Sequence, residues 1–402
     1  MRTSAIVFLL TVLCSSAQSA GDLGKFRARL KSGKATTIVC FGDSVTGLYY
    51  HTGGRRTYTD MIGIALRKAV PDANVTMINA GISGNTAMAG LKRIERDVLA
   101  KKPDLVTVMF GLNDMVRRSV DQYRENLEEI VTRCRAAGAE VLLCTPNAVT
   151  DTSSRPTAKL LEYCAAMRKV AEEMRVPLCD TYAAFDELRT EDRLHWRLTM
   201  SDAIHPNMGG HRFIAEQITM TILGKPVSLS GTPPPSGALR HVRKLIAGGK
   251  GIQVLAMPPT DKLIAGTLKR AGAKGSIEVT TWQTEKHSLA QIETHARNIV
   301  RKMKPDLVVI AVPRDATSAS EEEFIKAHMW IRNWSLSFGR EVWNCAVVHP
   351  AIFAPDALEG HRDELIRKLV SAHDLHLIDR PAGDDRSGEK IFRAWFAREL
   401  TD

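Results

Sequence analysis

One serine of this chain combines a reactive side chain with a position at the end of a strand. Ser44 follows the run Thr36–Phe41, whose residues are all β-branched or apolar, and the chain can turn at Gly42. A serine hydroxyl attacks an acyl carbon only when a base takes its proton. His205 is the candidate base, and Asp202, three residues earlier, is placed to accept its Nδ1 proton. These residues predict nucleophilic acyl transfer.

Attack on an acyl carbon creates an oxyanion, which needs hydrogen-bond donors already in place. The candidate donors are the backbone N–H groups of Ser44 and Gly84 and the side-chain amide of Asn113, which donates without carrying a charge. The segments that hold these residues each follow a strand-like run. Because parallel strands share one direction, their carboxyl ends meet at the same edge of a sheet, where open α/β sheets bind ligands.

The elements that must position these residues alternate regularly between Gly21 and Gly224. Helical patterns separate the strand-like runs, and one helix starts at Ser119 with Gln122 completing a capping box. A last helix is predicted from about Met208 to a stop before Gly224. This alternation predicts a parallel sheet covered on both faces. Its five strands are expected at Thr36–Phe41, Asn74–Asn79, Asp104–Phe110, Glu140–Thr145 and Val176–Thr181.

Four short blocks, in this order, resemble those of the SGNH or GDSL hydrolase family. They read GDS at 42–44, GISGNT at 81–86, GLND at 111–114 and DxxH at 202–205. The resemblance covers about residues 35–224 and implies a three-layer α/β/α fold with a five-stranded parallel sheet in flavodoxin-like order. It also implies a catalytic triad of Ser44, Asp202 and His205, and an oxyanion hole of Ser44, Gly84 and Asn113. Thr46 replaces the second glycine of a G-x-S-x-G elbow, which disfavours the α/β-hydrolase fold.

Residues that would contact the substrate are less clearly marked. Arg55, Arg56 and Arg117 follow the first and third blocks, so they are expected around the pocket mouth. Their alternative is a solvated loop face, where exposed charges contribute little. Trp196 lies shortly before the triad and is expected either to wall the pocket or to fill the core. No ligand set for a metal and no P-loop is found, so no cofactor or metal is expected.

A second domain is predicted after a Pro/Ser/Gly-rich linker. The expected division is a signal peptide at 1–20, a catalytic domain at 21–226, the linker at 227–245 and a second α/β domain at 246–402. The second domain is interpreted as a degenerate, non-catalytic copy, because the KPDLV of 102–106 recurs at 304–308. Thr260 would then stand in place of Ser44. The alternative is an unrelated α/β domain. In either case, the strands of the second domain are expected at Ile252–Met257, Ser276–Thr281, Asp306–Val312, Glu341–Val348 and Asp374–Asp379.

Composition and the first residues indicate where the protein works. The formal charge of the 402 residues is +10, but acidic residues accompany the basic ones along the chain, so a nucleic-acid partner is not expected. Arg2, the apolar run Ala5–Leu13 and small residues up to Ala20 predict a signal peptide and export. A lipid anchor on Cys14 is disfavoured because Leu13 does not fit a lipobox.

Two questions remain open at this point. Cys144 and Cys179 lie on neighbouring predicted strands, where either a disulfide or two buried thiols would fit. The expected function is an exported serine esterase that removes acetyl or short acyl groups, with an acylated carbohydrate as the candidate substrate and no stable membrane span. The alternatives are a lysophospholipase or lipase, and a carbohydrate-binding protein that has lost catalysis.

Overall fold

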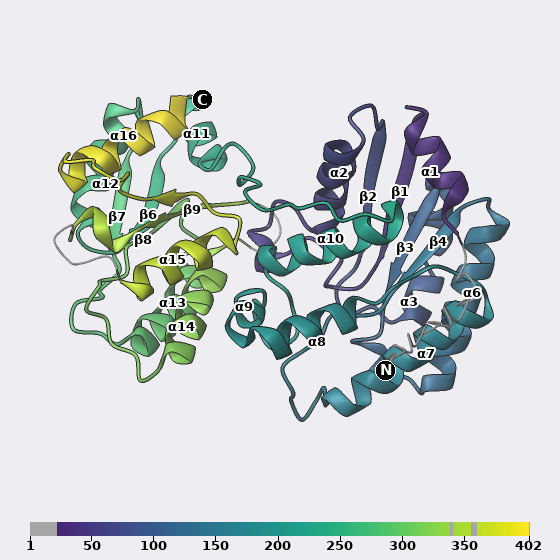
Figure 1. Ribbon diagram of the computed structural model, residues 1–402. Coiled ribbons are helices and arrows are strands. Elements are labelled where there is room, and N and C mark those ends of the chain that lie inside the picture. The colour runs from purple at the N-terminus through teal and green to yellow at the C-terminus, as the bar shows by residue number, and fades with distance from the viewer. Residues whose placement is uncertain (1–21, 338–340, 355–359, 402) are drawn as a thin grey trace, which may run out of the picture.

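The structure is a computed structural model, which describes residues 22–337, 341–354 and 360–401. The predicted signal peptide lies outside these residues. Figure 1 shows two α/β lobes side by side, joined by an extended segment that leaves α10. Each lobe has its own parallel sheet and its own hydrophobic core.

The first sheet has the strand order β2-β1-β3-β4-β5, with all pairs parallel. Its central strands β1 and β3 are buried almost throughout, as strands covered on both faces must be. This is the predicted flavodoxin-like order. The strands are β1 Thr36–Gly42, β2 Val75–Gly81, β3 Leu105–Met109, β4 Glu140–Cys144 and β5 Leu178–Cys179.

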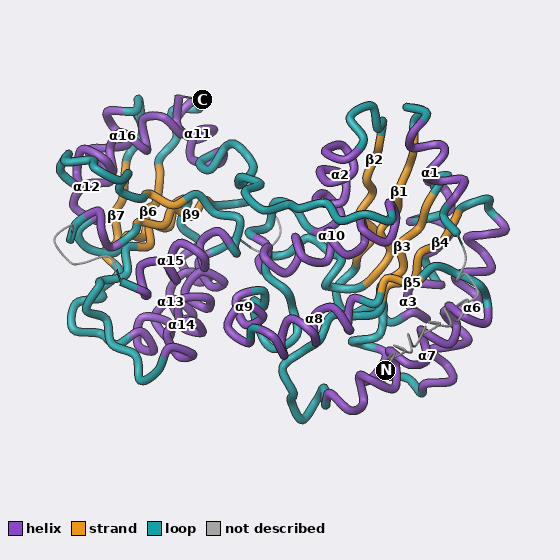
Figure 2. The backbone as a smooth tube through the Cα atoms, in the orientation of Figure 1, coloured by secondary structure: helices purple, strands orange, loops and turns teal. Residues whose placement is uncertain are grey.

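Helices cover both faces of this sheet, as Figure 2 shows. The helices α2 and α10 pack together on one side, and α3, α6 and α7 pack on the other. The predicted capping box of Ser119 and Gln122 is present at the start of α6. The helices are α1 Gly24–Lys31, η1 Tyr50–Thr52, α2 Tyr58–Ala69, α3 Ala87–Leu91, α4 Ile94–Asp97, η2 Leu99–Lys101, α5 Asp114–Arg117, α6 Val120–Ala136, α7 Thr157–Glu173, α8 Thr181–Glu191, α9 Arg193–Leu198 and α10 Met208–Leu223.

The second sheet repeats this topology, in the order β10-β9-β8-β6-β7, again with all pairs parallel. Read from β7, the strand order along the chain matches that of the first sheet. The strands are β6 Ile252–Ala256, β7 Ile277–Thr281, β8 Leu307–Ile310, β9 Asn344–Val348 and β10 Leu377–Ile378. The helices are α11 Arg240–Ala247, α12 Thr260–Arg270, α13 Leu289–Met303, α14 Glu321–Ser335, η3 Pro350–Ile352, α15 His361–Ser371 and α16 Gly388–Thr401.

The chain passes from one core to the other between residues 230 and 237. Val227 and Leu229 still belong to the first core, whereas Leu239 and Val242 belong to the second. The intervening segment is held against the rest of the protein, because the Arg55 guanidinium donates to the carbonyl oxygens of Pro235 and Ser236. Among the helices that the structure describes, none combines the length and apolar character needed to cross a membrane.

Candidate active site

Ser44 lies directly after β1, at the carboxyl edge of the first sheet. The turn requires glycine at 42, because a Cβ there would lie 2.6 Å from the carbonyl oxygen of Met109. Asp43 serves the turn, since its Oδ1 accepts from the Val45 N–H at 2.9 Å. Burial raises the pKa of the Asp43 carboxyl to about 6. The turn thereby presents Ser44 half-buried at the sheet edge.

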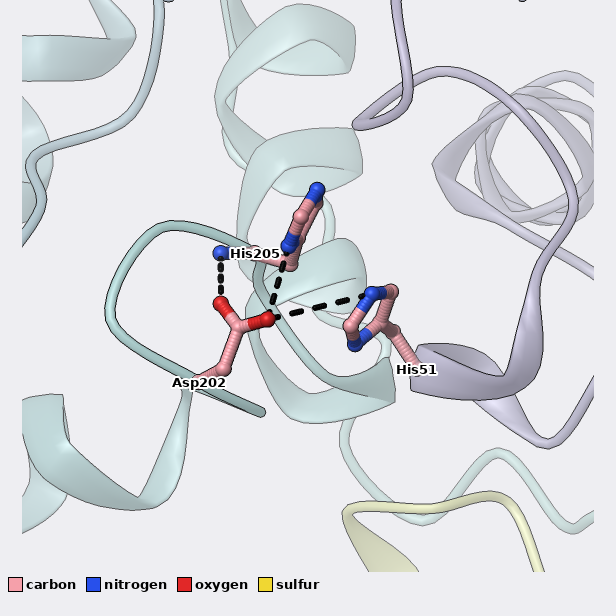
Figure 3. Close-up of side chains that lie close together, drawn as sticks. All are labelled: His51, Asp202 and His205. Carbon is pink, nitrogen blue, oxygen red and sulfur yellow. Dashed lines mark hydrogen bonds and ion pairs between the residues drawn. The ribbon is translucent and has the colours of Figure 1, made fainter. Parts of the chain in front are cut away.

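The three residues of the predicted triad lie in one hydrogen-bonded chain. Ser44 Oγ is 3.0 Å from His205 Nε2, and His205 Nδ1 is 2.8 Å from Asp202 Oδ2. The second carboxylate oxygen, Asp202 Oδ1, accepts from the backbone N–H of His205 at 2.7 Å, as Figure 3 shows. Burial acts to raise the pKa of Asp202, but the hydrogen bonds and positive charge of His205 hold it below its ordinary value. Asp202 is therefore an ionised acceptor for the imidazole.

The three expected oxyanion donors follow β1, β2 and β3 at the same edge of the sheet. Within the described residues, the backbone N–H groups of Ser44 and Gly84 find no acceptor. Gly84 has φ +73°, a conformation that favours glycine. The amide of Asn113 donates to the Asn85 carbonyl at 3.1 Å, which fixes its direction. The chain thus combines an activated hydroxyl with free N–H donors, as acyl transfer requires.

Comparison with known proteins agrees with this geometry. Residues 40–213 match the model of the GDSL-like Lipase/Acylhydrolase family. This part of the chain belongs to that family. The protein is accordingly a hydrolase that acts on ester bonds. We call the first lobe the GDSL domain, and the match leaves the second lobe unassigned.

Several relatives align with the GDSL domain over most of their own length. An acetylxylan esterase of Geobacillus stearothermophilus is 28% identical over 208 residues, which are 46% of this chain and 93% of the relative. The thioesterase 1/protease 1/lysophospholipase L1 of Escherichia coli is 28% identical over 187 residues, 46% of this chain and 83% of the relative. A solved structure of the Geobacillus acetylxylan esterase is 26% identical and covers 48% of this chain and 97% of its own, with a TM-score of 0.42.

His51 lies against the triad and was not predicted to have a role there. Its ring stacks on that of His205, with centroids 4.1 Å apart and 17° between the planes. Its Nε2 is 3.9 Å from Asp202 Oδ2, as Figure 3 shows. Burial and the nearby charge of His205 lower the pKa of His51 well below its ordinary value, so the ring is neutral. The sequence signal was only its closeness to Ser44.

A hydrogen-bonded chain links His51 to the second lobe. His51 Nδ1 is 2.9 Å from the hydroxyl of Ser201, the residue before Asp202. The Asn333 amide of α14 donates to this hydroxyl at 3.0 Å, and Asn333 Oδ1 lies 3.1 Å from His373 Nε2. The chain therefore runs from the second lobe to the ring that stacks on His205.

The structure places two of the four expected substrate residues elsewhere. Arg56 forms a two-point ion pair with the buried Asp374 of the second lobe, at 2.5 and 2.8 Å, and Arg55 donates to the linker. Both arginines hold the lobes together and do not surround the pocket mouth. Arg117 donates to the carbonyl oxygen of Gly84, one of the expected oxyanion donors, at 2.7 Å. Trp196 is buried in the wall of a cleft between the lobes.

The remaining expectations concern metals and thiols. His51, Asp202 and His205 offer ligand atoms within 4.8 Å of one another, but Asp202 Oδ2 and His205 Nδ1 are joined by the triad hydrogen bond. A cation that took both atoms as ligands would break that bond. Cys144 and Cys179 are paired in register between β4 and β5, and both are free thiols.

Thr260, the expected counterpart of Ser44, has no such surroundings. It is buried at the start of α12, and its hydroxyl donates to the Met257 carbonyl at 2.6 Å. A hydroxyl that is buried and already committed to a carbonyl is not placed for nucleophilic attack.

Proposed function

We propose that this protein is an exported esterase that removes acetyl or other short acyl groups from carbohydrate through an acyl-enzyme on Ser44. The observation that carries the proposal is the hydrogen-bonded chain from Ser44 through His205 to Asp202, beside unoccupied N–H donors. An ester hydrolase of this family needs a nucleophile, a base and oxyanion donors, and the GDSL domain supplies each of them at one sheet edge.

In the proposed first step, His205 Nε2 takes the proton of the Ser44 hydroxyl as Oγ attacks the acyl carbon. The oxyanion that forms is stabilised by the N–H groups of Ser44 and Gly84 and by the Asn113 amide. When this intermediate collapses, the C–O bond to the sugar breaks and the departing oxygen takes the proton from His205. Water then attacks the acyl-enzyme, with His205 again taking a proton as base. The bond between the acyl carbon and Ser44 Oγ breaks, Oγ takes the proton back from His205, and the carboxylic acid is released.

The substrate class is supported by one relative and by the first residues. The acetylxylan esterase aligns over 93% of its length, which favours a small acyl group on a glycan. The pattern of residues 1–20 favours export, which would bring the enzyme to extracellular polymers. The lysophospholipase relative aligns over a smaller share, 83%, of its own length and supports the alternative of a longer acyl chain.

Two measurements test the proposal. The protein is assayed on acetylated xylan and on p-nitrophenyl esters of increasing chain length, and a fluorophosphonate probe is used to find the reactive serine. We expect the highest kcat/KM on acetyl and short esters, labelling at Ser44, and loss of activity in Ser44→Ala and His205→Ala while the fold is kept. Turnover by Ser44→Ala at the rate of the unchanged protein would refute the mechanism. A preference for long-chain esters would favour the lysophospholipase alternative.

A further inference from the structure

A cleft between the two lobes adjoins the candidate active site. Its volume is about 790 Å³. One wall comes from the GDSL domain, through the segments near Arg155, α9 and the 202–204 loop, and the other comes from α14 of the second lobe. Figure 1 shows α9 between α14 and the rest of the GDSL domain. The second lobe therefore forms part of the surroundings of the catalytic loop.

The lining of the cleft includes residues that contact the Asn113 segment and residues of the triad loop. Arg155 lines it and donates to the Leu112 carbonyl at 3.1 Å, and its Nη2 lies 3.4 Å from Asn113 Oδ1. Asp202 and Ile204 line it as well, so the triad loop forms part of the same wall. The cleft therefore lies next to the residues around which an acyl group would bind.

The lining combines aromatic faces with hydrogen-bonding side chains. Trp196 and Trp330 lie on opposite walls, one from each lobe. Hydroxyl side chains such as Thr152 and charged side chains such as Lys326 are interspersed with them. A sugar ring matches this pattern, because its C–H face packs on an indole while its hydroxyl groups take up donors and acceptors.

Charge and apolar continuity argue against other ligands. The four basic side chains of the lining (Arg155, Arg193, Arg197 and Lys326) stand against three acidic ones (Asp202, Glu321 and Glu322), which leaves a difference of 4 − 3 = +1. Such a surface does not select a strongly anionic polymer. A fatty acyl chain needs an unbroken apolar channel, whereas charged residues interrupt this lining throughout.

The aromatic wall is held in place before a ligand arrives. Trp330 stacks on Trp334, with ring centroids 5.4 Å apart, and the Arg301 guanidinium lies 4.7 Å from the centre of the Trp334 ring. Arg197 of α9 lies 3.6 Å from Met329 Sδ of α14, so the helices that supply the two walls touch. Pre-organised walls lower the entropic cost of binding a flexible chain.

From these observations we infer that the cleft between the lobes binds a neutral glycan chain that continues from the acylated sugar, with Trp330 as the platform on the second lobe. The inference rests on the proposed function, since it adds a binding site for the part of the substrate remote from the ester. The second lobe thereby gives the esterase its preference for polymers over small esters.

The experiment compares two substrates in the full chain. p-Nitrophenyl acetate has no sugar to place in the cleft, whereas acetylated xylan does. In Trp330→Ala we expect kcat/KM on acetylated xylan to fall about tenfold more than on p-nitrophenyl acetate, through KM, and Trp330→Phe to restore most of it. Leu161→Ala, an exposed apolar change on α7 outside the cleft, should alter neither rate. Equal losses on both substrates, or none on either, would overturn the inference.

Binding without turnover separates this inference from the proposed function. Calorimetry with xylo-oligosaccharides uses Ser44→Ala and the double variant Ser44→Ala/Trp330→Ala, and we expect binding to weaken about tenfold in the double variant. If the unchanged protein cleaves acetylated xylan but these affinities are equal, the cleft assignment fails and the proposed function stands. If it cleaves only p-nitrophenyl acetate, the substrate class fails, and the calorimetry alone then decides the cleft. A greater loss on p-nitrophenyl palmitate than on xylan would assign the cleft to an acyl chain and overturn the inference.

Discussion

The Asn113 side chain is held in place by the protein itself, so its removal tests its contribution to the reaction rate directly. Its amide donates to Asn85 and lies 3.4 Å from Asp43 Oδ2. In Asn113→Ala we expect kcat on p-nitrophenyl acetate to fall by about 10²–10³ with a much smaller change in KM, because an oxyanion donor acts mainly in the transition state. Steady-state kinetics check this. A loss smaller than about threefold would show that Asn113 does not donate to the oxyanion.

His51 is expected to act on the reaction only by positioning His205. In His51→Ala the stacked ring and its bond to Ser201 are lost, so we expect kcat to fall about tenfold while KM changes little. His51→Phe keeps a stacking ring and should recover part of the loss. Because its low pKa keeps His51 neutral, the pH–rate profile should keep its shape in both variants. A shifted profile in His51→Phe would mean that His51 itself exchanges protons during the reaction.

The residue types predicted that Ser44, Asp202 and His205 lie together, but they did not predict the neighbours of these residues. Ser44, Asp202 and His205 lie within hydrogen-bonding distance in the structure, as the blocks implied. Arg55 and Arg56 could not be interpreted from the sequence in the same way. An arginine close in sequence to the nucleophile can turn toward any acceptor within reach. The acceptors of Arg55 and Arg56 lie in the linker and at Asp374, far along the chain.

At the scale of elements, all ten expected strands are present, but the last strand of each sheet is much shorter than predicted. Strand β5 pairs only at Leu178–Cys179, where Val176–Thr181 was expected. Pro177 lacks an N–H for the ladder, and the Asp180 side chain instead caps α8 by accepting from the Ala183 N–H. An apolar run predicts that a strand is present. The residues at which the strand ends depend on helix caps and prolines, which the apolar run itself does not show.

The short helix η1 depends on a glycine that touches the other lobe. Gly53 follows η1 with φ +75°, and a Cβ there would lie 2.5 Å from the His373 carbonyl oxygen. Gly53→Ala should therefore lower the free energy of unfolding by more than the roughly 1–2 kcal/mol that the backbone conformation alone costs an alanine. Urea unfolding checks this.

Gly231→Ala is the matched control for that measurement. Gly231 has φ +73°, and nothing lies within 4 Å of its Cβ position, so only the conformational cost applies. Equal losses in the two variants would show that the lobes can move apart at Gly53 without cost.

At the scale of the whole molecule, buried histidines should make the fold sensitive to acid. Burial lowers the pKa of His211 and His373 to about 3, and burial also lowers that of His51 and His328. Unfolded histidine takes up a proton near ~6.5, so between about pH 6.5 and 3 the unfolded chain binds more protons. The free energy of unfolding should therefore decrease as the pH is lowered through this window. The decrease should be about 1.4 kcal/mol per pH unit for each such histidine.

Two carboxyls offset part of this effect. Burial raises the pKa of Asp43 to about 6 and that of Asp114 to about 7, so the folded protein holds extra protons between about pH 4 and 7. Single variants isolate the histidine contribution in urea unfolding at several pH values. His373→Gln should flatten the slope by about one proton below pH 6.5. An unaltered slope in His373→Gln would contradict the assignment.

The shared strand order of the two sheets is what a duplicated domain would show, and the sequence already indicated it through the repeated KPDLV. What the sequence could not predict is how the lobes meet. That contact depends on single side chains, such as Asn333 and Asp374, whose partners lie more than a hundred residues away.

Some residues of the GDSL domain belong to the core of the second lobe, which limits how this protein can be cut and recombined. Leu198 lies within the GDSL domain by sequence but belongs to the core of the second lobe, and Tyr50 and Leu194 pack against that core. A gene cut in the linker, after the first core ends at Leu229, would therefore encode a GDSL domain whose Leu198 and Leu194 side chains have lost the apolar residues that cover them. The family match ends within α10, so it is shorter than the folded GDSL domain. Chimeras in which the second lobe is replaced must therefore keep a matching surface on α14. Without that surface, we expect the GDSL domain to lose its esterase activity.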